Sequence, residues 1–264
     1  MRTAKILLFL GIGSCLMLAG CKSQYEKLLE GNDSEAKYKA AFEYFNKGKY
    51  KKSADLFESL SVISTGTTRD DTVQFYWGMS NYRYKDYYTA ETNFKNFVSK
   101  FPRSSFTEEA SFLRIDCLYR ATLRYELDQT PTYSAIVAIN EYKIAYPETV
   151  HRDVCDRILL ELRERLDTKA YQNAYIYYKM EDYKAARVAL KNVLKDNSDN
   201  MHREEILFYT AMASYKYADM SIASKQKERY MLFVDDYFNF IGEYPESPKR
   251  KELERLYKKA KEKI

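Results

Sequence analysis

A repeated pair of helix patterns is the feature that most limits how this chain can fold. In the segment RYKDYYTAETNFKNFVSKFPRS, the residues Tyr87, Ala90 and Phe94 are spaced so that they share one face of a helix. Phe97 continues that face, and Pro102 closes the pattern because proline cannot continue a helix. Helix pairs that repeat in this way bury their apolar faces by stacking on their neighbours. The pattern therefore predicts an all-α fold.

The same pattern occurs five times, and each copy follows another helical stretch that is rich in tyrosine and alanine. These preceding helices are expected at residues 35–47, 71–84, 106–126, 168–180 and 203–219. The matching anchor positions of the five copies are Ser53, Ala90, Ala135, Ala186 and Phe233. Their intervals of 37, 45, 51 and 47 residues exceed the period of about 34 that is typical of such helix pairs. We therefore expect insertions or longer helices in the later units.

The pattern resembles the tetratricopeptide repeat, and its signature is clearest in the second copy. The signature residues there are Trp77, Gly78, Tyr87, Ala90, Phe94 and Pro102. The resemblance implies a right-handed superhelix, or α-solenoid, of about five helix pairs that ends in a C-terminal capping helix. The pairs are expected near residues 35–69, 70–105, 106–150, 168–200 and 203–247, in a repeat domain that spans 35–264. Small residues such as Ala41 and Gly78 would let the paired helices approach closely.

The last stretch of the chain, SPKRKELERLYKKAKEKI, predicts the capping helix over residues 248–264. Ser247 is expected to cap this helix, and Pro248 is expected at its first helical position. The apolar stripe of the helix comprises Leu253, Leu256, Tyr257, Ala260 and Ile264. Terminal repeats need a helix with a polar outer face, and the lysines on this face also suit an acidic partner or anionic lipid.

The first twenty residues are organised like a bacterial lipoprotein signal peptide. Arg2 and Lys5 precede the apolar run ILLFLGIGSCLMLA, which is shorter than the roughly 20 residues that cross a bilayer. The sequence Ala19-Gly20-Cys21 then matches the lipobox, in which small residues admit a peptidase and the cysteine thiol accepts a diacylglycerol. We expect Cys21 to carry this lipid and an N-acyl chain, which together anchor a protein firmly. The alternative is an ordinary secretory signal with an incidental cysteine.

After a signal peptide of residues 1–20, residues 21–34 are expected to form a short lipidated tether that holds the first repeats near the bilayer. Two further cysteines, Cys117 and Cys155, each lie in an apolar helical context. An oxidising compartment would permit a disulfide between them, whereas buried free thiols are common in such a context.

Residues that perform catalysis or bind metals are scarce in this sequence. His151 and His202 are the two histidines, and neither has a second ligand at metal-binding spacing. Paired carboxylates such as Glu108 and Glu109 are adjacent, so they do not face each other across a helix. A formal net charge of +5 on 264 residues is too small and too mixed for a nucleic-acid surface. We therefore expect a binding protein that is not an enzyme, with no metal or cofactor besides the lipid on Cys21.

A stack of helix pairs presents a concave groove lined by the first helix of each pair, which suits an extended peptide or the edge of a partner. The residues expected at this groove in the first two repeats are Tyr38, Phe42, Phe45, Asn46, Phe75, Met79, Tyr82 and Arg83. Aromatic, methionine and arginine side chains are those enriched at the centres of interfaces. About half of the eight are expected to face the groove, and the others to pack in the core.

A lipobox followed by five such repeats and a basic C-terminal helix resembles the BamD family of outer membrane lipoproteins, which act in β-barrel assembly. The recurring helix closures FPRS, YPET and YPES agree with this resemblance. The resemblance implies a non-catalytic scaffold that is lipid-anchored at the periplasmic face of the outer membrane. It further implies that the groove from Tyr38 to Arg83 binds unfolded outer membrane proteins. Residues 203–264 would dock BamA, alongside other subunits of the assembly machinery, for folding and insertion of barrels into the membrane.

The alternative function is a periplasmic repeat lipoprotein that acts as an adaptor in another cell-envelope complex. A glycan-binding lipoprotein would need a large carbohydrate-binding insertion, which no segment of this chain supplies. A lytic transglycosylase would need an isolated buried glutamate in a long cleft, and the sequence places none.

Overall fold

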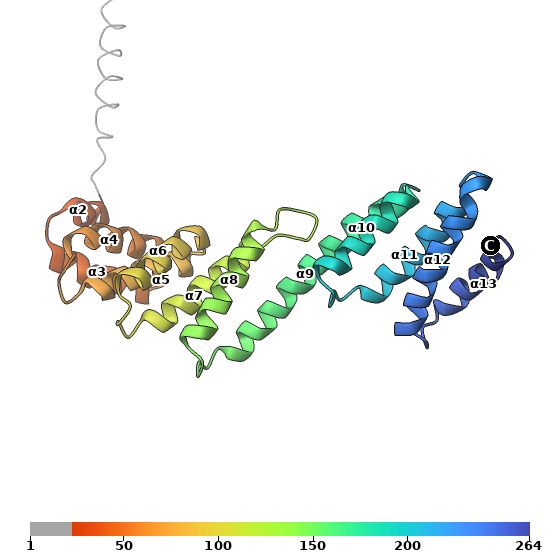
Figure 1. The fold of residues 1–264 in the computed structure, drawn as a ribbon. Coiled ribbons are helices and arrows are strands. Elements are labelled where there is room, and N and C mark those ends of the chain that lie inside the picture. The colour runs from red at the N-terminus through yellow and green to blue at the C-terminus, as the bar shows by residue number, and fades with distance from the viewer. Residues whose placement is uncertain (1–22) are drawn as a thin grey trace, which may run out of the picture. The chain divides into compact units, whose positions relative to one another are not determined.

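A computed structural model describes residues 23–264, and all regular structure within that range is helical. Figure 1 shows these helices in chain order. The chain divides into two compact units, one ending at Ala121 and the other running from Thr122 to Ile264. Between residues 23 and 264, none of the helices combines the length and the apolar character that a membrane crossing requires. The predicted all-α fold class is confirmed.

In the first unit, consecutive helices of the described range pack on each other. They are α2 (Gln24–Glu30), α3 (Ser34–Asn46), α4 (Tyr50–Ile63), α5 (Asp70–Tyr84), α6 (Tyr87–Lys100) and α7 (Thr107–Arg120). The rings of Phe57 and Phe94 are fully buried between these helices. A Cβ atom on Gly78 would lie 2.8 Å from the ring of Phe94. Glycine at this position therefore allows α5 and α6 to pack as closely as they do.

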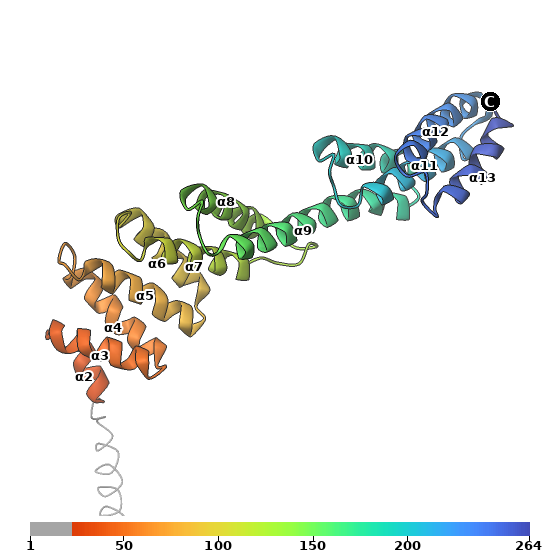
Figure 2. The same cartoon turned by 90° about the horizontal axis from the view of Figure 1, so that it is seen from below.

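The second unit follows the same plan with longer helices. They are α8 (Thr130–Ala145), α9 (Arg152–Lys179), α10 (Tyr183–Asp196), α11 (Arg203–Asp219), α12 (Ala223–Glu243) and α13 (Arg250–Lys261). The 28-residue helix α9 packs against both α8 and α10, as can be followed in Figure 2. An ion pair between Lys143 and Asp156 joins α8 to the first part of α9. The later part of α9 contributes Tyr171 and Ala174 to a cluster that includes Leu190 of α10.

The anchor positions of the repeat are all buried in the structure. Ser53, Ala90, Ala135, Ala186 and Phe233 all have 0% exposure. Four of these anchors are apolar. The fifth, Ser53, is polar, and its hydroxyl donates to the carbonyl of Ala41 at 3.0 Å. The predicted spacing of these anchors therefore identifies five buried positions.

Three of the second helices end in the same way, two residues before a proline. The last helical residues are Lys100, Ala145 and Glu243, and the prolines are Pro102, Pro147 and Pro245. The residue between them leaves the helical conformation, with φ from −123° to −129°, because a following proline disfavours the α region. In each case that residue is aromatic and its ring packs on an aromatic ring four positions earlier, at centroid distances of 5.1 to 5.9 Å.

Two helices predicted for the repeats have wrong boundaries, and both lie beyond residue 106. The helix expected over 106–126 ends at Arg120, and residues 121–129 form a loop. Arg165 and Lys169 of α9 hold this loop: Lys169 Nζ donates to the carbonyl of Leu127 at 2.7 Å. The helix expected over 168–180 begins sixteen residues earlier, at Arg152. Residues 152–167 thus extend an existing helix, whereas the sequence pattern left them between two repeats.

Residues 24–30 of the expected tether are helical. Ser23 caps α2 through a reciprocal capping box with Glu26, and Leu28 and Leu29 of α2 pack on the α3–α4 core. Residues 23–30 therefore belong to the packed fold, and the prediction of a tether that extends to residue 34 is wrong. The signal peptide of residues 1–20 and the lipidation of Cys21 lie outside the described residues.

The capping helix is present as α13, but it starts later than predicted. It begins at Arg250, so Pro248 precedes the helix, and the hydroxyl of Ser247 accepts from the N–H of Lys249 at 3.2 Å. The stripe residues Leu253, Leu256 and Ala260 are buried as expected. Ile264 lies beyond the helix and is 41% exposed, so its predicted place in the stripe is wrong.

Cys117 of α7 and Cys155 of α9 are both buried free thiols. Burial raises the pKa of the Cys117 thiol to about 12 and also raises the pKa of the Cys155 thiol. Both groups therefore stay protonated at neutral pH and act as small apolar side chains.

Candidate functional site

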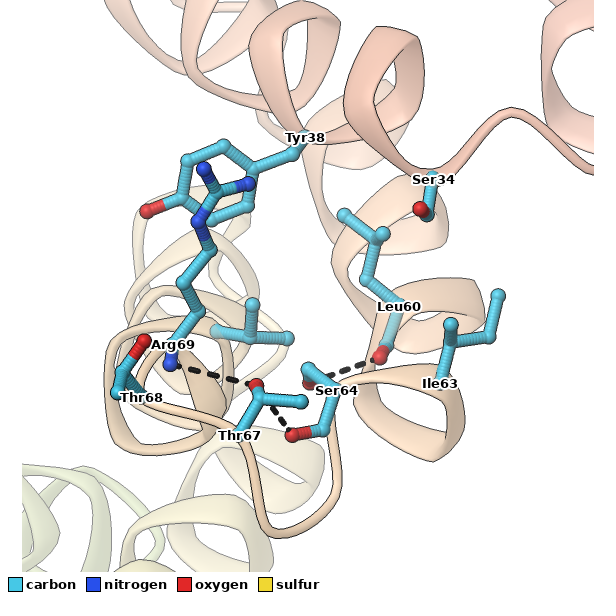
Figure 3. Close-up of a pocket in the computed structure, with 9 residues that line it drawn as sticks. Ser34, Tyr38, Leu60, Ile63, Ser64, Thr67, Thr68 and Arg69 are labelled. Carbon is cyan, nitrogen blue, oxygen red and sulfur yellow. Dashed lines mark hydrogen bonds between the residues drawn. The ribbon is translucent and has the colours of Figure 1, made fainter.

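A hollow of about 260 Å³ opens in the first unit, where the start of α3, the end of α4 and the start of α5 meet (Figure 3). Its lining residues are Ser34, Tyr38, Leu60, Ile63, Ser64, Thr67, Thr68, Arg69 and Val73. Leu60 and Val73 are buried at its base, whereas Tyr38 is half-buried and Arg69 is exposed at its rim. The hollow therefore combines an apolar base with a polar and cationic rim.

The loop between α4 and α5 forms one wall of the hollow and is fixed by local hydrogen bonds. The hydroxyl of Ser64 donates to the carbonyl of Leu60 at 2.9 Å, and that of Thr67 donates to the carbonyl of Ser64 at 2.7 Å. Gly66 turns the chain with φ of +75°, a conformation that glycine adopts without strain. Its N–H donates to the carboxylate of Asp70 at 2.9 Å.

Asp70 ties this loop to the body of the unit. Its side chain is buried and forms an ion pair with Lys100 of α6 at 2.9 Å. Burial opposes ionisation of this carboxyl, but the hydrogen bonds from Lys100 and from the N–H of Gly66 outweigh it and lower the pKa of Asp70. The carboxylate is therefore ionised at neutral pH, and it holds the wall of the hollow in place.

Arg69 stands over the ring of Tyr38 at the mouth of the hollow. Its guanidinium carbon lies 4.6 Å from the ring centroid, which is a cation–π contact. One of its nitrogens also donates to Glu35 at 2.6 Å. Glu35 is 72% exposed on its side chain, and such an exposed ion pair contributes little stability and exchanges readily. Arg69 is thus positioned by an aromatic ring and is accessible to an anion that replaces Glu35.

The dimensions of the hollow limit what it can hold. Sites for drug-sized ligands enclose roughly 300–1,000 Å³, and this one is smaller at about 260 Å³. Its apolar base suits one aliphatic or aromatic side chain, and Arg69 can bind a carboxylate beside it. These features match the end of a peptide chain better than they match a cofactor.

The structure places the eight predicted groove residues in several different environments. Tyr38 alone lines the hollow. Phe42 and Phe45 are half-buried and pack on the ring of Tyr76 at centroid distances of 4.7 and 5.4 Å. Asn46 is exposed at the end of α3. The α3 residues thus form an aromatic surface that continues from the hollow toward the α3–α4 turn.

The four predicted residues of α5 are mostly engaged within the unit. Phe75 is buried and stacks on Phe106 at 4.5 Å, so it is a core residue. Met79 is half-buried in the same core. The hydroxyl of Tyr82 donates to Asp116 of α7 at 2.7 Å, and burial, together with that bond, raises the pKa of Tyr82 to about 12. Arg83 is exposed at the far end of α5, where it lines a separate basic hollow.

Sequence reasoning missed the residues from α4 and from the following loop. The groove was expected on the first helix of each pair, whereas Leu60, Ile63 and Ser64 belong to the second helix and its end. The segment STGTTRD could have identified the loop, because glycine and hydroxyl residues are enriched in turns. The position of this loop beside Tyr38 depends on tertiary packing, which no local sequence pattern predicts.

No group of histidine, cysteine, aspartate and glutamate side chains within residues 23–264 is arranged to hold a metal ion. His202 is half-buried just before α11 and stacks on the ring of Tyr171 at 4.9 Å. Its Nε2 lies 2.9 Å from the hydroxyl of Thr168. These contacts give His202 a packing role between α9 and α11.

Comparison with known proteins defines the family. The model of the outer membrane lipoprotein family YfiO matches residues 30–232, from α2 to α12. No curated protein matches the chain. Among solved structures, the chain is similar to a thermophilic TPR protein of Thermus thermophilus, with 15% identity and a TM-score of 0.34 over 86% of this chain and 98% of that chain. Because the family match covers well over half of the sequence, this protein belongs to the YfiO family of outer membrane lipoproteins.

Proposed function

We propose that this protein is the lipid-anchored scaffold of the β-barrel assembly machinery at the periplasmic face of the outer membrane. In this role it binds unfolded outer membrane proteins through its first unit, docks BamA through residues 203–264, and catalyses no reaction. Its membership of an outer membrane lipoprotein family supports this role. The single observation that carries it is the hollow beneath Tyr38 and Arg69, which suits the end of a peptide chain.

The chemistry of an unfolded barrel strand matches this hollow and the aromatic surface beside it. Strands of outer membrane barrels alternate apolar and polar residues and carry aromatic residues at the membrane interfaces. A terminal aromatic ring would enter the hollow over Leu60 and Val73, and its carboxylate would replace Glu35 on Arg69. The preceding residues would extend over Phe42 and Phe45, with Asn46 as a partner for backbone amides.

The experiment is a titration with a synthetic peptide in which apolar and polar residues alternate and the last residue is phenylalanine. The protein in this titration is residues 21–264 with the substitution Cys21→Ser. Arg69→Gln removes the cation that would bind the carboxylate, and a charged hydrogen bond contributes about 1.5–3 kcal/mol. We therefore expect the dissociation constant to rise at least about tenfold. The same peptide with an amidated end should bind the wild-type and variant chains equally, since it has no carboxylate for Arg69.

Arg83→Gln is the matched control, because it removes an exposed arginine from the other end of α5. Peptide affinity should be unchanged in this variant. If Arg83→Gln weakened binding of the peptide with a free carboxylate and Arg69→Gln did not, the carboxylate would bind at the opposite end of α5 and the hollow would not be the peptide site.

Exposed apolar side chains in the second unit support a partner surface on α12. Met231 and Phe238 are 53% and 51% exposed, and their spacing of seven residues puts them on one face of the helix. Phe238 also packs on Tyr257 of the basic helix α13, with ring centroids 5.6 Å apart. BamA should therefore copurify with the membrane-extracted protein and be lost with Met231→Asp plus Phe238→Asp.

The control for this surface is Val188→Asp on α10, where the side chain is 52% exposed. That variant should retain BamA. Copurification of a different envelope complex without BamA would instead support the adaptor function.

A further inference from the structure

A second hollow in the first unit is lined almost entirely by cations and tyrosines. It encloses about 300 Å³ between the α3–α4 turn and the end of α5, and its lining residues are Gly48, Lys49, Tyr50, Lys51, Lys52, Arg83, Tyr84 and Lys85. We call Lys49, Lys51, Lys52, Arg83 and Lys85 the basic edge. All five residues are exposed, and the ring of Tyr84 between them is 51% exposed. An exposed aromatic ring among cations is suited to an interface between water and an apolar phase.

Most of the positive charge of the basic edge is not neutralised within the unit. Lys51 pairs with Asp55 at 2.7 Å. Lys52 lies 4.7 Å from the ring centroid of Tyr25, which leaves its charge uncompensated. Within the described part of the chain, no ion pair includes Lys49, Arg83 or Lys85. A net attraction for an anionic surface follows from this arrangement.

The backbone at the basic edge does not require a lysine. Lys85 adopts φ of +70°, and Glu181, at the equivalent turn before α10 in the second unit, adopts φ of +61°. Lysine and glutamate thus occupy the same strained left-handed position. The turn fixes the conformation of this residue and leaves its charge free to vary, so the cation at position 85 is not explained by folding.

Helix α2 lies beside this same edge. Tyr25, near the first residue of α2, packs on Tyr44 near the end of α3 at 5.5 Å. Its hydroxyl donates to Asp55 of α4 at 3.1 Å and lies 3.4 Å from the carbonyl of Lys52. Tyr25 follows Cys21 by four positions, and four residues span at most about 14 Å. A lipid on Cys21 would therefore hold the bilayer surface close to the basic edge.

We propose that the basic edge is a membrane-contact surface that binds the anionic headgroups of the bilayer in which the protein is anchored. The lysines and Arg83 would bind phosphate groups of lipids such as phosphatidylglycerol, and Tyr84 would lie at the headgroup level. This contact would fix the first unit against the bilayer, which the acyl chains alone cannot do. The inference rests on the lipid anchor at Cys21 that is part of the proposed function.

The test uses residues 21–264 with Cys21→Ser, which keep every described helix and lack the lipid. Cosedimentation is measured with vesicles of phosphatidylcholine alone and with vesicles that also contain phosphatidylglycerol. Binding should require phosphatidylglycerol and should fall with added salt, which screens charge. Each cation near an anionic membrane contributes about 1 kcal/mol, or about fivefold in binding. The variant Lys49→Gln, Arg83→Gln and Lys85→Gln should therefore bind roughly 100-fold more weakly at low salt.

The matched control removes three other exposed cations of the same unit, with Lys39→Gln, Lys95→Gln and Arg103→Gln. It has the same net charge as the first variant and should retain most of the binding. Equal losses in the two variants, or equal binding to both kinds of vesicle, would overturn the proposal. Because these vesicles contain no protein partner, failure here would leave the peptide titration and the copurification of BamA unaffected. Failure of those experiments would equally leave the vesicle result intact.

Discussion

At the scale of single residues, close packing in this protein depends on small side chains placed opposite large rings. Gly78 is the sharpest case, because a Cβ atom there would lie 2.8 Å from one ring atom of Phe94 and 3.3 Å from the Cβ of Asn93. Phe94 is fully buried and cannot move aside without disturbing the α5–α6 contact. The same helix pair also contains a buried hydrogen bond of 2.9 Å between Asn81 and Asn93.

We predict that Gly78→Ala destabilises the protein even though alanine favours helices by about 1 kcal/mol over glycine. Overpacking of a filled core costs about 1–3 kcal/mol, and loss of the bond from Asn81 to Asn93 would add to it. The melting temperature should therefore fall by several degrees. Gly242→Ala is the control, since nothing lies within 4 Å of the added Cβ, and it should leave the melting temperature unchanged or slightly higher. An increase in the Gly78→Ala variant would show that α5 and α6 can separate at low cost.

Ser53 shows why an anchor position can carry a polar group. Its hydroxyl donates to Ala41 and also contacts the hydroxyl of Ser80 at 3.0 Å, so the three helices α3, α4 and α5 share one buried contact. The sequence predicted that position 53 would be buried because of its spacing from Ala90. It could not predict the partner Ser80, because that contact joins neighbouring repeats.

At the scale of elements, the ends of helices that a proline closes could be predicted from the sequence. The start of a long helix such as α9, which has no such signal, could not. The ends of α6, α8 and α12 follow from a local rule, since a proline disfavours helix in the residue before it. The start of α9 depends on residues 152–167, which are rich in charge and have no repeat signature. The sequence predicts a tether where α2 lies, because seven residues are too few to show a period. Its capping box at Ser23 and Glu26 was the available signal.

The helices α10, α11 and α12 are joined through one buried carboxylate. Asp236 of α12 is 2% exposed. It accepts from Arg187 at 2.7 Å and from Lys191 at 2.6 Å, both on α10. The hydroxyl of Ser214 on α11 also donates to it, at 2.5 Å. This carboxylate therefore satisfies donors from both neighbouring helices at once.

We predict that Asp236→Asn destabilises the second unit by about 2–4 kcal/mol. Removing one partner from a buried ion pair leaves the other charge uncompensated, which costs about 3–5 kcal/mol in a fully buried site. The partial exposure of Arg187 and Lys191 reduces that cost. Chemical denaturation followed by circular dichroism measures the change. Asp235→Asn, at the neighbouring position outside the core, is the control and should shift stability by no more than about 0.5 kcal/mol. Equal effects at both positions would mean that the network around Asp236 does not stabilise the unit.

At the scale of the whole molecule, the sequence defined the stacking of helices better than it defined the candidate site. Burial in every repeat follows from spacing, so the positions Ala135, Ala186 and Phe233 could be assigned without any tertiary information. The hollow under Tyr38 needs a loop, a helix end and a cation–π contact with Arg69 at the same place. Such a convergence depends on how three elements pack, and no periodic pattern within a single helix encodes it.

The many tyrosines of this protein make its stability sensitive to alkaline pH. The chain contains 26 tyrosines, and tyrosines with raised pKa values occur in both units. Burial, reinforced by the bond to Asp116, raises the pKa of Tyr82 to about 12, and burial raises the pKa of Tyr178 to about 12. An unfolded tyrosine ionises near pH 10, so the folded state holds these protons more tightly. The contribution to stability is therefore complete below about pH 10 and is lost as the pH rises from there toward 12.

We predict that the melting temperature falls steeply above about pH 10 and that Tyr178→Phe makes the fall shallower. Phenylalanine keeps the ring contacts of Tyr178 with Tyr175, Tyr183 and Tyr209 but has no proton to lose. Each buried tyrosine changes the pH dependence by up to about 1.4 kcal/mol per pH unit, which corresponds to about 3–6 °C for a chain of this size. Tyr88→Phe is the control, because it removes a hydroxyl from a side chain that is 87% exposed and lies in the first unit. Tyrosinate absorbance reports the ionisation directly. If it rises above about pH 10 while the melting temperatures of the wild type and of Tyr178→Phe stay equal, ionisation of Tyr178 does not limit alkaline stability. A shallower curve for Tyr178→Phe alone would link the loss of stability to the aromatic packing between α9, α10 and α11.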